Sequence, residues 1–260
     1  MNLTETAAHI NRLAAFCGPR DVPELSWQAL RRHFGVDRVN VMALFGGSIL
    51  CGGDVLAEAM RAGVAEQYVI VGGAGHTTGT LRARMQELFP DIRAESMAEA
   101  ELFDIYLRRR YGLSADWLET RSTNCGNNIT NLLALLDGAG VPCRSVILCQ
   151  DATMQRRMAA GMRKHRPDAQ IVNYAAYRAT VAADENGLRY VEAIPGMWAI
   201  ERYVSLLLGE IPRLTDDAQG YGPRGKGFIA HVDIPEAVAA AFRALKEHYE
   251  VRGADERYAG

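Results

Sequence analysis

The chain has 260 residues, of which 48% are hydrophobic and 23% are charged. This composition is typical of one large globular domain or two small ones, and it excludes disordered, collagenous and membrane-embedded classes. Because 29 Lys and Arg residues nearly balance 31 Asp and Glu residues, the formal charge of −2 provides no field that would attract nucleic acid or an anionic membrane. We therefore expect a small-molecule partner and no nucleic acid.

The five cysteines are odd in number, lie far apart and form no CxxC pair, which argues against a disulfide framework and a zinc ribbon. The N-terminal sequence lacks the pattern of a signal peptide, and no stretch approaches the roughly 18 apolar residues of a transmembrane helix. We expect a cytoplasmic protein without a transmembrane segment. No feature of the sequence specifies an oligomeric state.

The first 38 residues are predicted to be helical. Apolar positions recur at helical spacing after Thr4, which is a candidate N-cap. Ser26 is a candidate N-cap of a second helix that ends near Gly35. From residue 39 onward, short apolar runs predict buried strands at residues 39–44, 68–71, 145–148 and 171–174.

Helices are predicted between these strands, starting after Asp54, Ser96 and Thr153. The alternation of strands and helices predicts an α/β fold with a doubly wound, mainly parallel sheet over residues 37–180. Residues 1–36 and 195–260 are expected to form appended helices or a small second lobe, with one helix at 197–208 and another after Pro235. His231 falls in a predicted strand, which favours a structural role.

The glycine-rich loop at 216–228 is longer than most connections and lacks periodicity, which is typical of a lid. Tyr221 and Arg224 are flanked by glycines and are the candidate lid residues. The alternative is an ordinary surface loop.

Ligands of open α/β sheets bind outside the carboxyl ends of the strands, and two glycine-rich segments follow the first two predicted strands. The candidate ligand-binding residues there are Gly46, Gly47, Gly72, Gly73, Gly75 and His76. Glycines let backbone N–H groups approach an anion, and a helix that begins near Thr78 would add its positive end. The alternative is that these glycines only turn the chain. The GxGxxxG spacing from residue 73 is a weak indication of a dinucleotide, and no Walker A loop is present.

A third segment, residues 119–128, gathers polar side chains at a predicted helix start. Its candidates are Glu119, Ser122, Asn124 and Asn128. They favour a binding segment, although capping by Ser122 or Thr123 is the alternative.

The fourth segment, residues 150–157, supplies Gln150, Asp151, Met154 and Arg157 as candidates. Arg157 could clamp a carboxylate or phosphate, whereas the alternative is a solvated basic face that includes Arg156 and Arg163.

Glu99 stands three residues after Ser96 and matches a capping box, which alone would account for it. The chain contains no GxSxG or HExxH motif, and its six histidines form no ligand-spaced pair. We therefore expect no metal site, and the catalytic residues stay unassigned.

These segments resemble the YdcF family of the bacterial SanA/YdcF/ElyC superfamily, a domain of unknown function. The resemblance rests on GGxGH at 72–76, AEA at 98–100, STNCG at 122–126, QDxTMQRR at 150–157, WxxERYxSLLxGExPRLxDD at 198–217, GYGPRG at 220–225 and HVD at 231–233. It spans residues 39 to 240. It implies a Rossmann-like sheet with extra helices and binding of S-adenosyl-L-methionine.

The resemblance also assigns roles to single residues. It places Gly46, Gly47, Gly72 and Gly73 in the family's glycine loops. It equates Glu99 and Glu119 with two acids of the family and Arg157 with the family's helix arginine. Two positions depart from the wider superfamily, because Met154 replaces a histidine and Asn127 replaces a glutamate. A thioether cannot shuttle protons, which argues against chemistry that depends on that histidine.

The leading hypothesis is a protein that binds S-adenosyl-L-methionine or a related adenosine ligand. In an extended form of this hypothesis, the protein is a transferase of unknown substrate. The alternative is a hydrolase or phosphotransferase that acts on a cell-envelope precursor or nucleotide, with Glu99, Glu119 and Asp151 as acid/base candidates. A third hypothesis is a regulatory binding module without chemistry.

Overall fold

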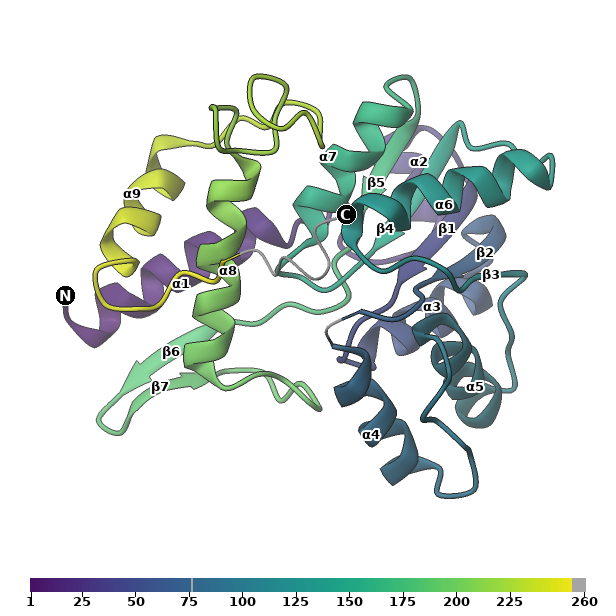
Figure 1. Ribbon diagram of the computed structural model, residues 1–260, viewed down its shortest axis with the longest axis horizontal. Helices are drawn as coiled ribbons and strands as arrows, with labels where there is room; N and C mark the ends of the chain where they lie inside the picture. Colours follow the sequence, from purple (N-terminus) through teal and green to yellow (C-terminus); the bar gives the residue numbers. More distant parts are fainter. Residues whose placement is uncertain (76, 254–260) are drawn as a thin grey trace.

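A computed structural model describes residues 1–75 and 77–253 of the chain. Its central feature is a parallel five-stranded sheet in the order β3-β2-β1-β4-β5 (Figure 1). The strands are β1 (Val39–Phe45), β2 (Ala65–Val71), β3 (Trp117–Glu119), β4 (Ser145–Cys149) and β5 (Gln170–Asn173). This is the strand order of the Rossmann fold, so the predicted α/β, doubly wound sheet is confirmed.

Four strands coincide with the predicted apolar runs. The sequence pattern does not predict β3, because this strand has only three residues and pairs with β2 alone at the edge of the sheet. Two hydrophobic residues followed by Glu119 form too short a pattern to distinguish a strand from a loop.

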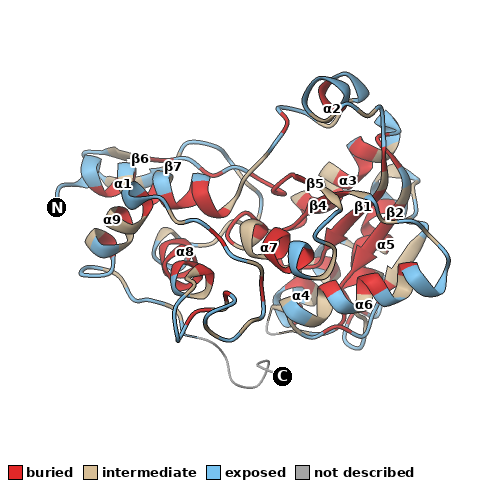
Figure 2. Ribbon diagram, turned by 90° about the horizontal axis from the view of Figure 1, so that it is seen from above, coloured by how far each residue is buried: buried red, intermediate tan, exposed pale blue. Residues whose placement is uncertain are grey.

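The helices are α1 (Leu3–Cys17), α2 (Trp27–Phe34), α3 (Cys51–Ala62), α4 (Thr78–Leu88), α5 (Glu99–Tyr111), α6 (Cys125–Gly138), α7 (Gln155–His165), α8 (Ile200–Leu214) and α9 (Glu236–Leu245). Successive strand residues point to opposite faces of the sheet, so β1 serves two cores. Val41, Ala43 and Phe45 pack with α6 and α7, whereas Met42 and Leu44 pack with α3 and α5. The buried interior of both layers is visible in Figure 2.

Helix starts differ from several predicted caps. Ser26 caps α2 as predicted, and Gly35 ends that helix in the left-handed conformation. Asn2 caps α1 in place of Thr4, because it forms a capping box with Glu5. α3 begins three residues before Asp54, which lies in its first turn.

Two further predicted caps are wrong. α5 begins at Glu99, and its first turn is closed by a hydrogen bond from the Ala98 N–H to Glu101 Oε2 (2.7 Å) in place of a box between Ser96 and Glu99. Thr153 bonds through its N–H and hydroxyl to Asp151, forming a turn, and α7 begins at Gln155.

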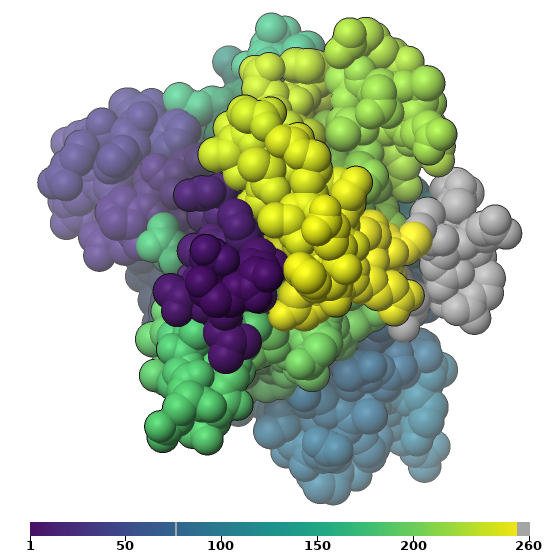
Figure 3. Space-filling view, turned by 90° about the vertical axis from the view of Figure 1, so that its left-hand side faces the viewer, coloured from purple at the N-terminus to yellow at the C-terminus, as the bar shows by residue number. Residues whose placement is uncertain are grey.

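The C-terminal part packs with the N-terminal helix. α1 contacts α8, α9 and an antiparallel hairpin formed by β6 (Val181–Asp184) and β7 (Gly187–Tyr190). In Figure 3 the N-terminal residues lie directly against the yellow C-terminal segment. We call α1, α8, α9 and this hairpin the helical lobe. α8 is longer than the predicted helix and extends to Leu214.

His231 does not lie in a strand, which corrects the prediction. Its ring nitrogens contact Asp216 Oδ2 (2.7 Å) and Asp233 Oδ1 (3.0 Å), so it ties two loop segments together. Hydrogen bonds with Asp233 and Asp216 raise its pKa.

No helix among residues 1–75 and 77–253 combines the length and apolar character needed to cross a bilayer.

Candidate functional site

The strand order reverses direction between β1 and β4, and a crevice at such a switch point is where open α/β sheets bind ligands. A pocket of about 140 Å³ opens at this place, and we call it the strand-end pocket. Its lining residues come from the loops after β1, β2, β3 and β4, from the first turns of α5, α6 and α7, from α8, and from the segments that follow α8 and α9: Gly46, Gly72, Gly73, Gly75, Thr77, Glu99, Ser122, Thr123, Asn124, Cys125, Asn128, Gln150, Met154, Arg157, Glu210, Arg213, Tyr221 and Arg252.

The glycines of this pocket allow close packing within the protein. A Cβ on Gly46 would lie 2.4 Å from Glu99 Oε2, and one on Gly73 would lie 2.3 Å from the Ser122 carbonyl oxygen. Gly75 is more open, since the nearest atom to its Cβ position is 3.5 Å away. The packing of the loops that build the site therefore requires glycine at positions 46 and 73, independently of any contact that their backbone makes with a ligand.

Glu99 is a buried acid of the pocket. Its Oε1 accepts a hydrogen bond from the Thr78 hydroxyl (2.7 Å), and the Thr77 hydroxyl lies at 3.5 Å. Burial raises the pKa of this carboxyl, and the threonine hydrogen bonds offset part of that increase. A buried acid with a raised pKa in a cleft is a candidate functional group.

The segment after β3 is organised around Glu119, which is buried and lies outside the pocket lining. Glu119 accepts hydrogen bonds from the backbone N–H groups of Arg121 and Ser122 and from Asn131. Asn124 caps α6 and accepts from the Asn127 N–H, so neither Ser122 nor Thr123 is the cap. Glu119 holds the loop in shape while Ser122, Asn124 and Asn128 line the pocket.

Gln150 follows β4 and is only 1% exposed. Its Oε1 accepts from the Asp151 N–H at 2.6 Å, which fixes the orientation of the amide. The Nε2 group then carries two donors, and among the described residues it has no hydrogen-bond partner. Since a buried unpaired donor costs about 1–3 kcal/mol, Gln150 is suited to donate to a ligand.

Asp151 does not line the strand-end pocket. Its Oδ1 accepts from the Thr153 N–H and hydroxyl and from the Tyr177 hydroxyl at 2.8 Å. Burial raises its pKa, and these hydrogen bonds partly counteract the increase.

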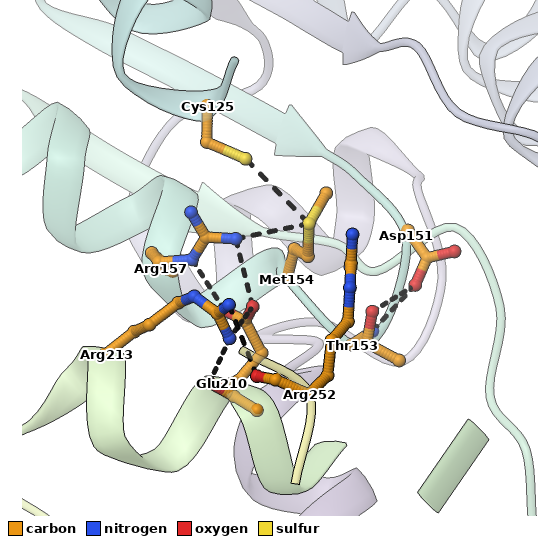
Figure 4. Close-up of polar contacts among 9 residues, drawn as sticks. Cys125, Asp151, Thr153, Met154, Arg157, Glu210, Arg213 and Arg252 are labelled. Atoms are coloured by element: carbon orange, nitrogen blue, oxygen red, sulfur yellow. Dashed lines mark hydrogen bonds and ion pairs between the residues drawn. The ribbon is translucent and has the colours of Figure 1, made fainter. Parts of the chain in front are cut away.

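An arginine cluster forms the side of the pocket that faces the helical lobe. Arg157 donates from Nε to Glu210 Oε2 (2.6 Å) and from Nη2 to Glu210 Oε1 (3.0 Å). Arg213 lies 3.8 Å from the same carboxylate, and Arg252 also lines the pocket. In Figure 4, dashed lines join Glu210 to both Arg157 and Arg213. Three arginines around one glutamate, together with the N-termini of α6 and α7, make this side attractive to an anion.

Two sulfur atoms lie beside this cluster. Met154 Sδ is 3.3 Å from Arg157 Nη2 and 3.8 Å from Cys125 Sγ (Figure 4). Met154 therefore packs against the arginine as a neutral, polarizable group.

Most of the predicted site residues meet in one pocket, and a few do not. Gly47, Glu119 and Asp151 lie outside its lining, and Gly47 lies instead beside a void of about 10 Å³ next to Gln150. His76 lies outside the described residues. Tyr221 lines the pocket, whereas Arg224 is exposed and pairs with Asp216 at 3.4 Å. The closing motion of the 216–228 loop stays a prediction.

The sequence interpretation missed six lining residues: Thr77, Thr123, Cys125, Glu210, Arg213 and Arg252. Thr77, Thr123 and Cys125 lie within segments that it already singled out. Glu210 and Arg213 are on α8, and the motif at residues 198–217 contains both, but helical periodicity alone gives no reason to place them in a site.

No protein-family model matches the chain. The chain is similar to an uncharacterized protein of Streptomyces coelicolor, with 27% identity over 195 residues that cover 75% of this chain and 76% of the relative. Because the relative is uncharacterized, the function of this chain has to be inferred from the residues of the pocket.

Proposed function

We propose that this chain belongs with the YdcF family and binds S-adenosyl-L-methionine, or a related adenosine ligand, in the strand-end pocket. The observation that carries the proposal is the presence of an arginine cluster and a buried acid, Glu99, in one pocket at the switch point of a Rossmann sheet. We also propose a cytoplasmic location.

The charges of the pocket suit the amino-acid end of this ligand. The arginine cluster complements a carboxylate, and Glu99 complements an ammonium, sulfonium or hydroxyl group. The Nε2 donors of Gln150 offer hydrogen bonds to an oxygen or nitrogen acceptor. No Walker A loop is needed, because the ligand carries no phosphate.

The size of the pocket refines this proposal. Its volume of about 140 Å³ is below the roughly 300–1,000 Å³ that encloses a whole drug-sized ligand. We therefore assign the pocket to the charged amino-acid end of the ligand.

Thermal and urea unfolding with added ligand test the proposal. At a hundredfold excess over Kd, S-adenosyl-L-methionine should stabilise the folded chain by about 2.7 kcal/mol. Methionine and adenosine, each offering half of the ligand, should stabilise it less at the same concentration. Equal unfolding curves with and without S-adenosyl-L-methionine would contradict the proposal. Incubation with methyl-labelled ligand then separates a transferase, which yields labelled product, from a binding module, which does not.

A second candidate is a hydrolase or phosphotransferase acting on a nucleotide or cell-envelope precursor. The favouring observation is that Glu99, an acid whose pKa is raised by burial, lies in the same pocket as the arginine cluster, which could hold a phosphate. Glu119 and Asp151 are no longer candidates for direct contact, since both lie outside the lining. Phosphate-ester turnover by wild type that is lost in Glu99→Gln would support this candidate, whereas equal background turnover in both would exclude it.

A further inference from the structure

A second pocket of about 420 Å³ lies where the helical lobe meets the sheet, and we call it the α1 pocket. Its walls come from α1, the turn after it, the segment that follows β5, and α8 (Figure 1). Its lining includes Asn11, Arg20, Tyr177, Arg178 and Tyr203. It shares no lining residue with the strand-end pocket.

The walls of the α1 pocket are fixed by hydrogen bonds. The Asn11 side chain accepts from the Val181 N–H (2.7 Å) and donates to the Val181 carbonyl (2.8 Å), joining α1 to β6. Arg20 donates from Nε to the Ala175 carbonyl at 2.7 Å, and its guanidinium lies 4.2 Å from the centre of the Tyr174 ring. A pocket whose walls are already ordered can bind a ligand at low entropic cost.

The charged side chains of the described lining are positive. Arg20 and Arg178 line the α1 pocket, and its described lining contains no Asp or Glu. The two carboxylates that accept hydrogen bonds from lining residues, Asp151 from Tyr177 (2.8 Å) and Glu192 from Thr180 (2.8 Å), lie outside the lining. The lining therefore favours an anion.

Tyr203 supplies an independent indication of a ligand. The Tyr203 side chain is 0% exposed, and its hydroxyl has no hydrogen-bond partner among the described residues. Leaving a buried hydroxyl unpaired is costly, so a group that pairs with it is stabilised there. The Tyr177 hydroxyl, by contrast, is satisfied by Asp151.

We propose that the α1 pocket is a second ligand site, which binds a small metabolite through a carboxylate or phosphate group. Arg20 and Arg178 contact the oxyanion, and the Tyr203 hydroxyl bonds a polar group of the same ligand. This proposal does not depend on the function of the strand-end pocket.

Amide NMR titrations with inorganic phosphate and with malonate test the proposal and distinguish the two oxyanion sources. Arg178→Gln and Tyr203→Phe are the test variants, and Arg32→Gln on exposed α2 is the charge-matched control. We expect saturable shifts of the Ala15 and Ala179 amides by at least one anion. We expect binding about tenfold weaker in Arg178→Gln, a few-fold weaker in Tyr203→Phe and unchanged in Arg32→Gln.

Tyr203→Phe removes a hydroxyl that has no partner among the described residues, so its stability without ligand should equal or exceed that of wild type. The proposal is overturned by the absence of saturable shifts up to about 20 mM anion. It is also overturned by shifts confined to Gly46 and Gly73 of the strand-end pocket, or by equal affinities in wild type and both test variants.

Discussion

Arg157 on α7 and Glu210 on α8 form a two-point ion pair with donor–acceptor distances of 2.6 and 3.0 Å. Both side chains are largely buried, with 13% and 5% of their surface exposed. The pair joins the sheet to the helical lobe at the wall of the strand-end pocket, so stability and site geometry depend on the same contact.

Glu210→Gln should lower the free energy of unfolding by about 3 kcal/mol, because it leaves the Arg157 charge buried with a weakened partner. Urea unfolding checks this value. Asp37→Asn, which breaks the exposed pair with Arg31, is the control and should leave the unfolding midpoint unchanged. Equal losses of stability in the two variants would show that the buried ion pair contributes no more to stability than the exposed one.

Glu99→Gln should stabilise the chain at neutral pH. Burial raises the pKa of Glu99 in the folded state, so the folded chain binds this proton more tightly than the unfolded chain does. The stability that this proton contributes is present below the unfolded pKa of about 4.3 and is lost as the pH rises through the folded pKa. Glutamine mimics the protonated form at every pH.

Thermal unfolding of both proteins at acid and neutral pH measures this effect. The advantage of Glu99→Gln over wild type should be small near pH 4 and larger at pH 7.5. A constant difference at the two pH values would show that Glu99 titrates as an ordinary acid.

Gly73→Ala should destabilise the chain by about 1–3 kcal/mol, because the new methyl group would overlap backbone oxygens. A Cβ there would lie 2.3 Å from the Ser122 carbonyl oxygen and 2.6 Å from that of Thr120. Gly79→Ala is the matched control on α4, where a Cβ would meet no atom within 4 Å, and it should stabilise the helix by up to about 1 kcal/mol. A loss of stability in Gly79→Ala equal to that in Gly73→Ala would contradict the packing argument.

Whether the sequence predicts a strand depends on how strongly the strand's own residues indicate it. β1, β2, β4 and β5 are buried in the sheet, and their continuous apolar runs predict them directly. The hairpin of β6 and β7 lies on the helical lobe and has a half-polar sequence, so periodicity alone does not reveal it. The Asn186-Gly187 dipeptide was the available signal, since it is typical of tight hairpins, although the turn itself consists of Glu185 and Asn186, and Gly187 begins β7.

Cys125 should be the first thiol to react with iodoacetamide, because it lines the strand-end pocket. Burial raises the pKa of Cys17, Cys149 and Cys143, and it raises that of Cys51 to about 12. Since the thiolate is the nucleophile, these four should react slowly. Peptide mass spectrometry over time identifies the order.

Saturating S-adenosyl-L-methionine should slow this alkylation by about 100-fold at a hundredfold excess over Kd. Cys125→Ser should remove the fast phase. Faster labelling of Cys51 or Cys143 than of Cys125 would contradict the accessibility that the pocket implies.

The sequence predicts a site residue only where the signal for it lies in the neighbouring residues of the chain. Gln150 and Glu99 follow from strand ends and short motifs, and both line the pocket. Glu210 and Arg213 belong to the motif at residues 198–217, but they reach the pocket only because α8 packs beside α7, a tertiary contact that the motif does not specify. Asp151 follows a strand end, where a site acid is expected, yet its carboxylate accepts hydrogen bonds from the Thr153 and Tyr177 hydroxyls and does not line the strand-end pocket.

Calorimetric titration of wild type and Gln150→Leu with S-adenosyl-L-methionine is the decisive experiment on the proposed ligand of the strand-end pocket. We predict one saturable site in wild type and binding about tenfold weaker in Gln150→Leu, which lacks the buried Nε2 donors. No binding heat in wild type up to about 1 mM ligand, or equal affinity in both proteins, would show that this pocket does not bind S-adenosyl-L-methionine through Gln150.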